Sequence, residues 1–251
     1  GLTTLASVAA SLVCAETPSE LADPTIDTVR SRYDYFASAT VPFGMVALSP
    51  DTHHGNLWDA GYRYGDTAIL DFSHVHNAQT AGIPVMVTTG TCRGQFGLEA
   101  HRSRFRHDRE VIRPGYHRVE LLDSGILAEL TASTRVGFHR YTFPAAPEAH
   151  VLFDLGAPLG PVKMEQSGAR CVNEREIEGF SVNAPTIRRK RPCTVYFVAR
   201  FDHPFDDFAG WKAEPTKKDV RAPATPDADG KIQGPGTGVA VSYRGVTAGR
   251  R

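Results

Sequence analysis

The stretch YHRVELLDSGILAELTASTRVGFHRYTF, residues 116–143, decides the fold class. Between residues 126 and 134, apolar and polar residues alternate with period 2, which is the pattern of a strand with one buried face. A three-residue connection containing Gly125 separates this strand from an expected strand at 116–122, and 136–143 continues the meander. The apolar face of the middle strand carries Ile126, Ala128, Leu130 and Ala132. The stretch therefore predicts neighbouring antiparallel strands.

The rest of the 251-residue chain shows similar short apolar segments between turns that contain glycine or proline. Ser49-Pro50-Asp51 and the Pro-, Gly-, Asp- and Lys-rich segment 214–238 are expected to be a turn and a loop. No amphipathic helix is expected after residue 20. The pattern predicts an all-β protein, an antiparallel β-sandwich. Further strands are expected at 41–48, 68–72, 83–89, 151–155, 177–182, 195–201 and 239–243.

The charge composition argues against two classes of partner. Lysine and arginine together number 28, as do aspartate and glutamate, so the formal net charge is zero. Nucleic acids and acidic membranes select basic surfaces, so neither is an expected partner. The dense basic run Arg188–Arg191 is expected to be a solvated or ion-paired loop. The four cysteines form no C-x-x-C motif, and no structural zinc site is suggested.

The N-terminus has the features of an export signal. Residues 2–13 are apolar and uncharged, and Val13-Cys14-Ala15 offers small residues for cleavage after Ala15. We expect residues 1–15 to be the remnant of a secretory signal and the protein to be secreted or periplasmic, in a bacterial cell envelope. A short buried helix is the alternative. The run is well short of the roughly 20 residues that span a membrane.

The segment from Ala39 to His76 is the richest in side chains that bind ligands. Trp58 lies among glycine and polar residues, where an indole can stack on the apolar face of a sugar ring. A tryptophan that closes one end of the sandwich is an equal alternative. Asp59, Tyr62 and Tyr64 would supply carboxylate and hydroxyl groups to the hydroxyls of a bound sugar.

His74 and His76 are spaced i, i+2, so on a strand both rings would point to one face. Such a pair can bind a metal, serve as structural histidines or hydrogen-bond a ligand, and the sequence leaves all three open. No third metal ligand is evident, so no metal site is predicted. Glycoside hydrolysis needs paired carboxylates, but none of the nearby acids has an identifiable partner, and no catalytic residue is predicted. These acids are Asp51, Asp59, Asp66 and Asp71.

Several motifs make the chain resemble the N-terminal domain of glycoside hydrolase family 92, the calcium-dependent exo-α-mannosidases. They follow the order of the family and cover most of residues 39–211. The motifs are ATVPFGMVALSPDT (39–52), GYRY (61–64), FSHVH (72–76), AGIPVM with TTG (81–90), RPGYHRVEL (113–121), AELTASTRVGFHRYTFP (128–144), NAPTIRR (183–189), VYFVARFD (195–202) and FAGW (208–211).

The resemblance implies a super-sandwich of the galactose-mutarotase-like kind over residues 22–243, incomplete at its C-terminal edge and followed by an unstructured tail at 244–251. The opening V-N-P-F-I-G-T-like segment of the family is degraded at Pro24–Thr28. In the family a large (α/α)6 barrel follows and supplies the general acid, the general base and most calcium ligands. This barrel is absent from the sequence, so the chain is expected to be a fragment that binds no calcium alone.

The resemblance also implies a function and a set of substrate-binding residues. The chain would be the substrate-pocket and interface domain of an inverting exo-α-mannosidase that removes terminal α-mannosides during N-glycan degradation, and it would be inactive alone. Its partners would be an α-mannoside glycan and the (α/α)6 domain. A non-catalytic carbohydrate-binding module and a His-dependent metal β-sandwich protein remain as alternatives. The expected substrate-binding residues are Trp58, Asp59, Tyr62, His74 and His76.

Overall fold

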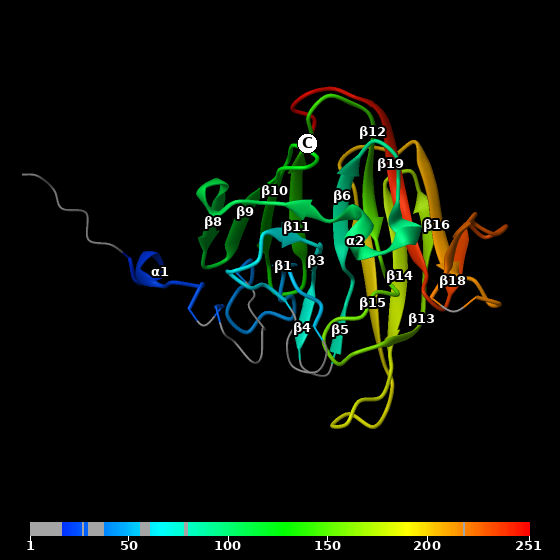
Figure 1. The fold of residues 1–251 in the computed structure, drawn as a ribbon, viewed down its shortest axis with the longest axis horizontal. Helices are drawn as coiled ribbons and strands as arrows, with labels where there is room; N and C mark the ends of the chain where they lie inside the picture. Colours follow the sequence, from blue (N-terminus) through cyan, green and yellow to red (C-terminus); the bar gives the residue numbers. More distant parts are fainter. Residues whose placement is uncertain (1–16, 27, 30–37, 56–60, 78–79, 218) are drawn as a thin grey trace, which may run out of the picture.

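The computed structural model describes residues 17–26, 28–29, 38–55, 61–77, 80–217 and 219–251. Antiparallel strands dominate these residues and form one large sheet and two four-stranded sheets (Figure 1). The prediction of an all-β antiparallel sandwich is confirmed. None of the described helices is long and apolar enough to cross a membrane. The helical elements among the described residues are α1 (Pro18–Leu21), η1 (Gly94–Phe96), α2 (Leu98–His101) and η2 (His107–Arg109).

The large sheet joins strands that lie far apart in the sequence, whereas the second sheet consists of four consecutive strands. The large sheet has the order β1 (Ser49–Asp51), β3 (Asp71–Ser73), β6 (Val85–Thr89), β12 (Ala146–Phe153), β19 (Gly238–Val246), β16 (Asp207–Ala213) and β17 (Arg221–Ala224). The second sheet has the order β11 (Gly137–Thr142), β10 (Ile126–Ala132), β9 (Tyr116–Leu121) and β8 (Glu110–Arg113). The third has the order β15 (Cys193–Arg200), β14 (Glu176–Asn183), β13 (Met164–Asn173) and β18 (Lys231–Gly234). Two further pairs are β2 (Ala68–Ile69) with β7 (Ser103–Arg104) and β4 (Val75–Asn77) with β5 (Thr80–Gly82).

Side chains from all three sheets meet in one buried apolar cluster. On β12, Val151 and Phe153 belong to this cluster, whereas Leu152 packs with Trp211 in a separate buried group. Phe153 stacks on Phe197 of β15 with the ring centroids 5.6 Å apart. Alternate residues of β12 therefore bury themselves on opposite faces of the large sheet, as the period-2 geometry of a strand requires.

The meander predicted from residues 116–143 is confirmed. The strand β10 pairs with β9 on one side and β11 on the other, so that Ala128 lies opposite both Val119 and Tyr141. Gly125 in the connection has φ 68°, a backbone conformation that glycine adopts without steric cost. Both the strand pairing and the turn therefore follow from local sequence.

The start of the large sheet differs from the prediction. The sequence predicts a strand at 41–48 and a turn at Ser49-Pro50-Asp51, but the strand β1 consists of the three predicted turn residues. Phe43 has φ 59°, which interrupts the extended backbone expected there. Pro50 is accommodated because β1 is the edge strand, where one backbone amide needs no partner. The expected strand at 68–72 is also divided, into β2 and β3.

The prediction of a loop over residues 214–238 is wrong for two segments, β17 and β18. Both are edge strands, which tolerate Pro223 in β17 and Gly234 in β18. Composition alone favoured a loop because proline and glycine are rare in central strands. The strand β12 likewise begins at Ala146 and includes Pro147, which the register with β19 leaves unpaired.

The C-terminal residues are held to the sheet beyond the point that the sequence predicts. The last strand continues past Tyr243 to Val246, into the expected tail at 244–251. The amide of Phe143 donates to the carbonyl of Arg250 at 3.0 Å, and the amide of Gly249 donates to the carbonyl of Phe143 at 2.9 Å. The Arg250 guanidinium also lies 5.3 Å from the ring centroid of Tyr243.

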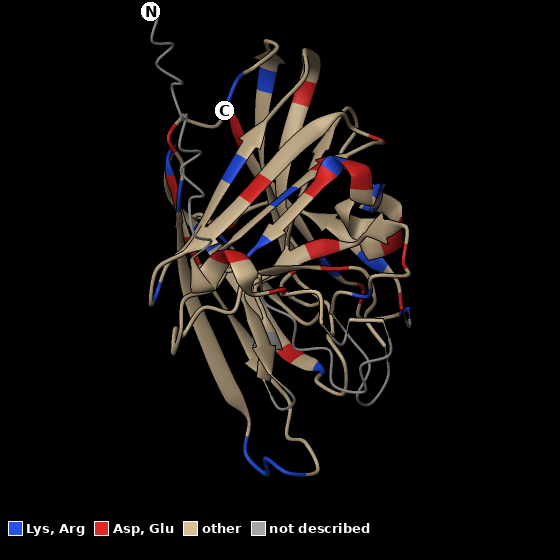
Figure 2. Cartoon of the chain, turned by 90° about the vertical axis from the view of Figure 1, so that its left-hand side faces the viewer, with Lys and Arg blue, Asp and Glu red and all other residues tan. Residues whose placement is uncertain are grey.

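Basic and acidic residues are interspersed over the strands (Figure 2), as the zero formal charge leads one to expect. The basic run Arg188–Arg191 lies in the connection between β14 and β15. Within that connection the Arg189 guanidinium donates to the carbonyl of Ala184 at 2.7 Å. The run is thus a loop, as the sequence predicts. The proposed signal remnant, residues 1–15, lies outside the described residues.

Candidate functional site

The loop predicted to carry the sugar-binding tryptophan is closed at its base by a backbone bridge. The amide of Gly61 donates to the carbonyl of His53 at 2.7 Å, and the amide of His53 donates to the carbonyl of Gly61 at 3.0 Å. Trp58 and Asp59 themselves lie outside the described residues, so their substrate-binding roles stay predictions. Next to the bridge, the Thr52 hydroxyl donates to the Asp66 carboxylate at 2.8 Å.

The first buried ion pair beside this loop joins Asp51 to His76. The His76 ring donates from Nε2 to Oδ1 of Asp51 at 2.7 Å and from Nδ1 to the carbonyl of Ala47 at 2.6 Å. The Ser73 hydroxyl donates to the other Asp51 oxygen. Because both ring nitrogens face oxygen acceptors, His76 is an imidazolium. Burial disfavours its charge, but the Asp51 carboxylate outweighs burial and raises the pKa of His76.

The second buried ion pair joins Asp71 to His54. The strand register places Asp71 directly opposite Asp51. The His54 ring donates to Oδ2 of Asp71 at 2.9 Å and to the carbonyl of Pro158 at 2.6 Å. Burial alone would lower the pKa of His54, but the Asp71 charge raises it to about 9. Burial and the neighbouring Asp51 raise the pKa of Asp71 above its usual range.

These residues include the one group among the described residues in which three metal-binding side chains converge. Asp51, His54 and Asp71 each place a ligand atom within 4.8 Å of the others. However, both Asp51 oxygens and both His54 nitrogens are already used in internal hydrogen bonds. Among the side-chain atoms of this group in the described structure, Oδ1 of Asp71 is a buried oxygen without a hydrogen bond. The arrangement is therefore one of two ion pairs across adjacent strands.

His74 lies at a bend between β3 and β4 and has a different environment from His76. Its Nδ1 donates to the carbonyl of Ile83 at 2.7 Å, so its Nε2 is an acceptor for the Nε2–H of His139 at 2.8 Å. The Tyr141 hydroxyl donates to Nδ1 of His139 at 2.7 Å. Burial lowers the pKa of His74 to about 4 and also lowers the pKa of His139. This chain of three side chains is neutral.

A second buried network surrounds Glu110. The Tyr62 hydroxyl donates to Oε2 of Glu110 at 2.9 Å, and the His117 ring lies 2.9 Å from Oε1. His107 approaches the same carboxylate at 2.6 Å and stacks on Tyr64 with ring centroids 3.9 Å apart. Tyr62 is fully buried, whereas Tyr64 is 41% exposed. Of these two tyrosines, Tyr64 is the one with an accessible ring.

The structure thus brings together His74, His76 and two of the four acids near them, Asp51 and Asp71, but keeps Tyr62 in a separate network. Their substrate-binding roles stay predictions. Sequence reasoning missed Glu110 and His139, which carry the two networks. The contacts that join them to predicted site residues, Glu110 to Tyr62 and His139 to His74, span 48 and 65 residues of the chain, and no local pattern signals them.

Comparison with known proteins identifies the family. The model of the glycosyl hydrolase family 92 N-terminal domain matches residues 21–250. The chain belongs to this family. All of the networks described above lie inside the matched region, and the resemblance read from the motifs is confirmed. No curated protein sequence matches the chain at a significant level.

Solved structures of family 92 enzymes have the same fold. A family 92 α-mannosidase of Bacteroides thetaiotaomicron, solved with mannoimidazole, has a TM-score of 0.77 and 25% identity over 92% of this chain and 31% of its own. The family 92 glycosyl hydrolase ccman5 has a TM-score of 0.74 and 24% identity, with 92% and 31% covered. A family 92 inverting mannosidase of the same Bacteroides species has a TM-score of 0.69 and 16% identity, with 91% and 30% covered. The chain therefore spans about a third of the length of these relatives.

Proposed function

We propose that this family 92 chain is the substrate-pocket and interface domain of an inverting exo-α-mannosidase that removes terminal α-mannosides from glycans. Two similar structures are named mannosidases, and one of them is named an inverting enzyme. The chain covers only 31% of the first of these, so the remaining two thirds of such an enzyme would include the catalytic domain.

The observation that carries this proposal is an exposed apolar surface beside the β10–β11 hairpin. Phe43 is fully exposed, and Met45 is 70%, Val136 49% and Phe138 53% exposed. The Met45 amide donates to the carbonyl of Thr134 at 2.7 Å, which ties the 43–45 loop to the hairpin. We call these four side chains the apolar hairpin surface. Clustered apolar side chains of this kind mark interaction sites on soluble proteins.

The backbone at Phe43 supports the same interpretation. Its φ of 59° lies in the left-handed region, which costs a bulky residue about 1–2 kcal/mol. The ring gains nothing from this strain within the described residues, because it is fully exposed. Residues with strained backbone conformations cluster at functional sites. We propose that Phe43 inserts between side chains of the (α/α)6 domain.

Hydrogen bonds at the two ends of the 54–60 loop support the proposed role of this domain in the substrate pocket. Three sets of bonds surround this base: the His53–Gly61 bridge, the Thr52–Asp66 bond and the His54–Asp71 ion pair. Rigid support lowers the entropy lost when a loop side chain stacks on a ligand. Trp58 is the residue of this loop that we propose as the wall of the mannose subsite.

The convergent group of acids and histidine among the described residues does not suit calcium. It takes six to eight oxygen ligands, whereas the convergent group Asp51–His54–Asp71 includes a protonated imidazole and two carboxylates that bind histidines. We propose that calcium, and the acid and base that inversion requires about 6.5–9.5 Å apart, belong to the remainder of the enzyme. The 251-residue chain then lacks activity.

An activity assay tests this proposal directly. The purified chain is incubated with an aryl α-mannoside, with added calcium and with a chelator. We expect no turnover in either case. Calcium-dependent turnover that is lost in Asp51→Asn or Asp71→Asn, with the fold retained by circular dichroism, would contradict the proposal by placing the chemistry in this domain.

A second assay tests the apolar hairpin surface. A dye that fluoresces on exposed apolar surface should bind the wild-type chain, and the double variant Phe43→Ser, Phe138→Ser should lose most of that signal. Phe96→Ser is the matched control, because Phe96 is 69% exposed on η1 and lies outside the hairpin surface. Equal loss of signal in the control and the double variant would contradict an interface at the hairpin.

A further inference from the structure

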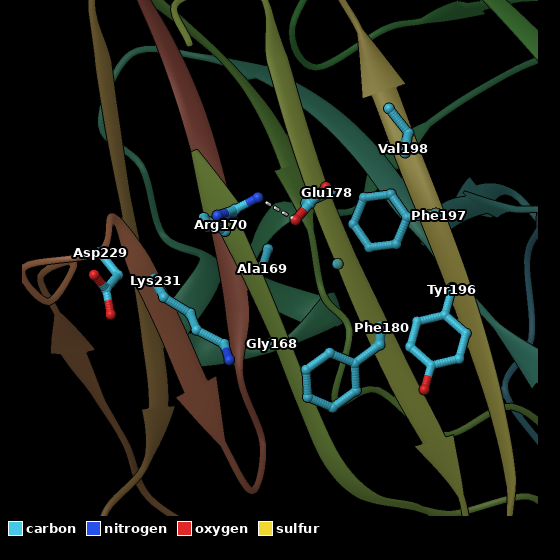
Figure 3. A pocket seen from close by; sticks show the side chains of 11 residues that line it. Gly168, Ala169, Arg170, Glu178, Phe180, Tyr196, Phe197, Val198, Asp229 and Lys231 are labelled. Carbon is cyan, nitrogen blue, oxygen red and sulfur yellow. Dashed lines mark hydrogen bonds and ion pairs between the residues drawn. The ribbon is translucent and has the colours of Figure 1, made fainter. Parts of the chain in front are cut away.

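We propose that the outer face of the β15-β14-β13-β18 sheet is a second glycan-binding site, formed by residues other than those of the predicted mannose pocket. This face contains a hollow of about 630 Å³. Volumes of 300–1,000 Å³ are usual for small-ligand sites. The hollow is lined by the middle parts of β13, β14 and β15, by Lys231 at the start of β18 and by Asp229 in the turn before it (Figure 3). We call it the outer groove.

The strand registers place the groove residues in two rows across the sheet. The first row runs Gly168, Phe180, Tyr196 from β13 to β15. The second row runs Lys231, Arg170, Glu178, Val198. One row is thus mainly aromatic and the next mainly charged, and side chains in the same rows share the outer face because the strand period is 2.

The aromatic row forms an open platform. The rings of Phe180 and Tyr196 lie side by side with centroids 6.4 Å apart and planes tilted by 45° (Figure 3). Tyr196 is 78% exposed, although it lies on a regular strand whose inward residues are packed. Gly168, next to Phe180 in the row, has no side chain to cover the neighbouring ring. A flat apolar ring face that is open to solvent suits the C–H face of a pyranose.

The charged row supplies groups that suit sugar hydroxyls. The Arg170 guanidinium donates from one nitrogen to the Glu178 carboxylate at 2.7 Å, and the pair offers both donors and acceptors to a ligand. Lys231 and Asp229 also line the groove. Neither the Lys231 ammonium nor the Asp229 carboxylate has a side-chain partner among the described residues. Hydroxyl groups can both donate to such carboxylates and accept from such cations.

The charge balance of the groove selects a neutral ligand. Two cations, Arg170 and Lys231, are matched by two anions, Glu178 and Asp229. A phosphate or nucleic-acid site would show an excess of cations, and the core of a protein interface is depleted of charged groups. A ligand with apolar ring faces and many hydroxyls fits both rows at once. We therefore assign the groove to a neutral oligosaccharide.

Affinity electrophoresis of the 251-residue chain tests this assignment. The chain is run in gels with soluble α-mannan, with a soluble β-glucan and with no polysaccharide; the choice of α-mannan rests on the proposed function. We expect retardation by α-mannan, a dissociation constant at least tenfold higher for Tyr196→Ala, and near wild-type binding for Tyr196→Phe, which keeps the ring. Glu178→Gln should weaken binding two- to fivefold.

A control variant separates the groove from the other surfaces. Phe96→Ala removes a comparably exposed aromatic ring outside the groove, 69% exposed against 78% for Tyr196, and should keep the wild-type retardation. Tyr196-dependent retardation by β-glucan alone would support the groove and contradict its mannose specificity. No retardation in either gel, equal retardation of Tyr196→Ala and wild type, or a wild-type dimer that Tyr196→Ala dissociates in sedimentation would overturn the proposal.

Discussion

Two groups of histidines lie next to each other near the edge of the large sheet. The rings of one group are protonated, and the rings of the other are neutral. In the ion-pair group, His54 and His76 each donate from both nitrogens to oxygen acceptors, and each faces an aspartate. In the neutral chain, His74 and His139 face each other and Tyr141. His76 is buried and His54, His74 and His139 are partly buried, and each group contains partly buried rings, so burial alone does not decide the charge. The charge is decided by the group that faces the second ring nitrogen, which is a carboxylate for His54 and His76 and another imidazole for His74.

The two groups differ in the free energy that is lost when one partner is removed. A buried ion pair leaves an uncompensated charge when one partner is removed, whereas a neutral hydrogen-bond chain leaves only an unpaired polar atom. The ion-pair group should therefore respond more strongly to single substitutions than the neutral chain. It should also respond to pH in the opposite direction.

The largest effect is expected for Asp51→Ala. This change leaves the His76 imidazolium buried without its carboxylate, and the free energy of unfolding should fall by about 3–5 kcal/mol, measured by urea denaturation. Asp108→Ala is the control, because Asp108 is in an exposed ion pair with Arg106. If Asp51→Ala is too unstable to purify, the double variant Asp51→Asn, His76→Gln should recover a folded protein, because neither residue of this pair then carries a charge and the neighbouring His54–Asp71 pair is kept. A loss for Asp51→Ala no larger than for the control would mean that His76 is neutral.

The next effect is a pH dependence of opposite sign for the two groups. His54 has a pKa raised to about 9 from an ordinary value near 6.5, so its contribution to stability is complete below pH 6.5 and is lost as the pH rises to 9. His74 has a pKa lowered to about 4, so its neutral form is favoured above pH 6.5 and stability is lost as the pH falls to 4. Each contribution should be on the order of 1–3 kcal/mol.

Thermal unfolding of the wild-type chain between pH 4 and pH 9 checks both losses of stability. We call the loss below pH 6.5 the acid limb and the loss above it the alkaline limb. His54→Gln should flatten the alkaline limb and leave the acid limb in place, and His74→Gln should do the reverse. If either variant flattened both limbs, or if wild-type stability rose from pH 6.5 to 9, the assigned charge states would be wrong.

A smaller effect is expected within the neutral chain from Tyr141→Phe. The substitution removes the hydroxyl that donates to His139 and leaves Nδ1 of that ring unpaired, which should cost about 1–2 kcal/mol. Tyr243→Phe is the matched control, because that ring is equally buried and its hydroxyl has no hydrogen bond among the described residues. The difference between the two variants in urea denaturation gives the contribution of the bond. Equal losses of stability in Tyr141→Phe and Tyr243→Phe would contradict the proposed hydrogen bond from the Tyr141 hydroxyl to His139.

The smallest effect is expected for Arg140→Ala, on the strand that carries His139 and Tyr141. Arg140 pairs with Glu129 at 2.5 Å on the solvent side, where water screens the pair. The unfolding midpoint should stay within the error of the wild-type value. A shift as large as that of Tyr141→Phe would show that the exposed pair supports the buried chain beside it.

The amino-acid sequence by itself determined the β10 meander and the family of the chain. Both depend on local information: residues two apart on a strand share a face whatever surrounds them, and Gly125 adopts its turn conformation at no steric cost. Where local signals misled, as at Pro50 and Pro223, the missing fact was that the strand is at an edge of its sheet. Edge position depends on which strands pair, and composition does not contain it.

Only the tertiary structure decided the protonation states of His74 and His76. His74 and His76 are two residues apart and have identical side chains, yet their partners lie 65 and 25 residues away in the chain. The carboxylate of Asp51 makes one an imidazolium, and the ring of His139 keeps the other neutral. The outer groove arose in the same way, since Phe180 and Tyr196 become neighbours only when β14 pairs with β15. A protonation state or a binding surface is a property of atoms in contact, and contacts between distant residues form only on folding.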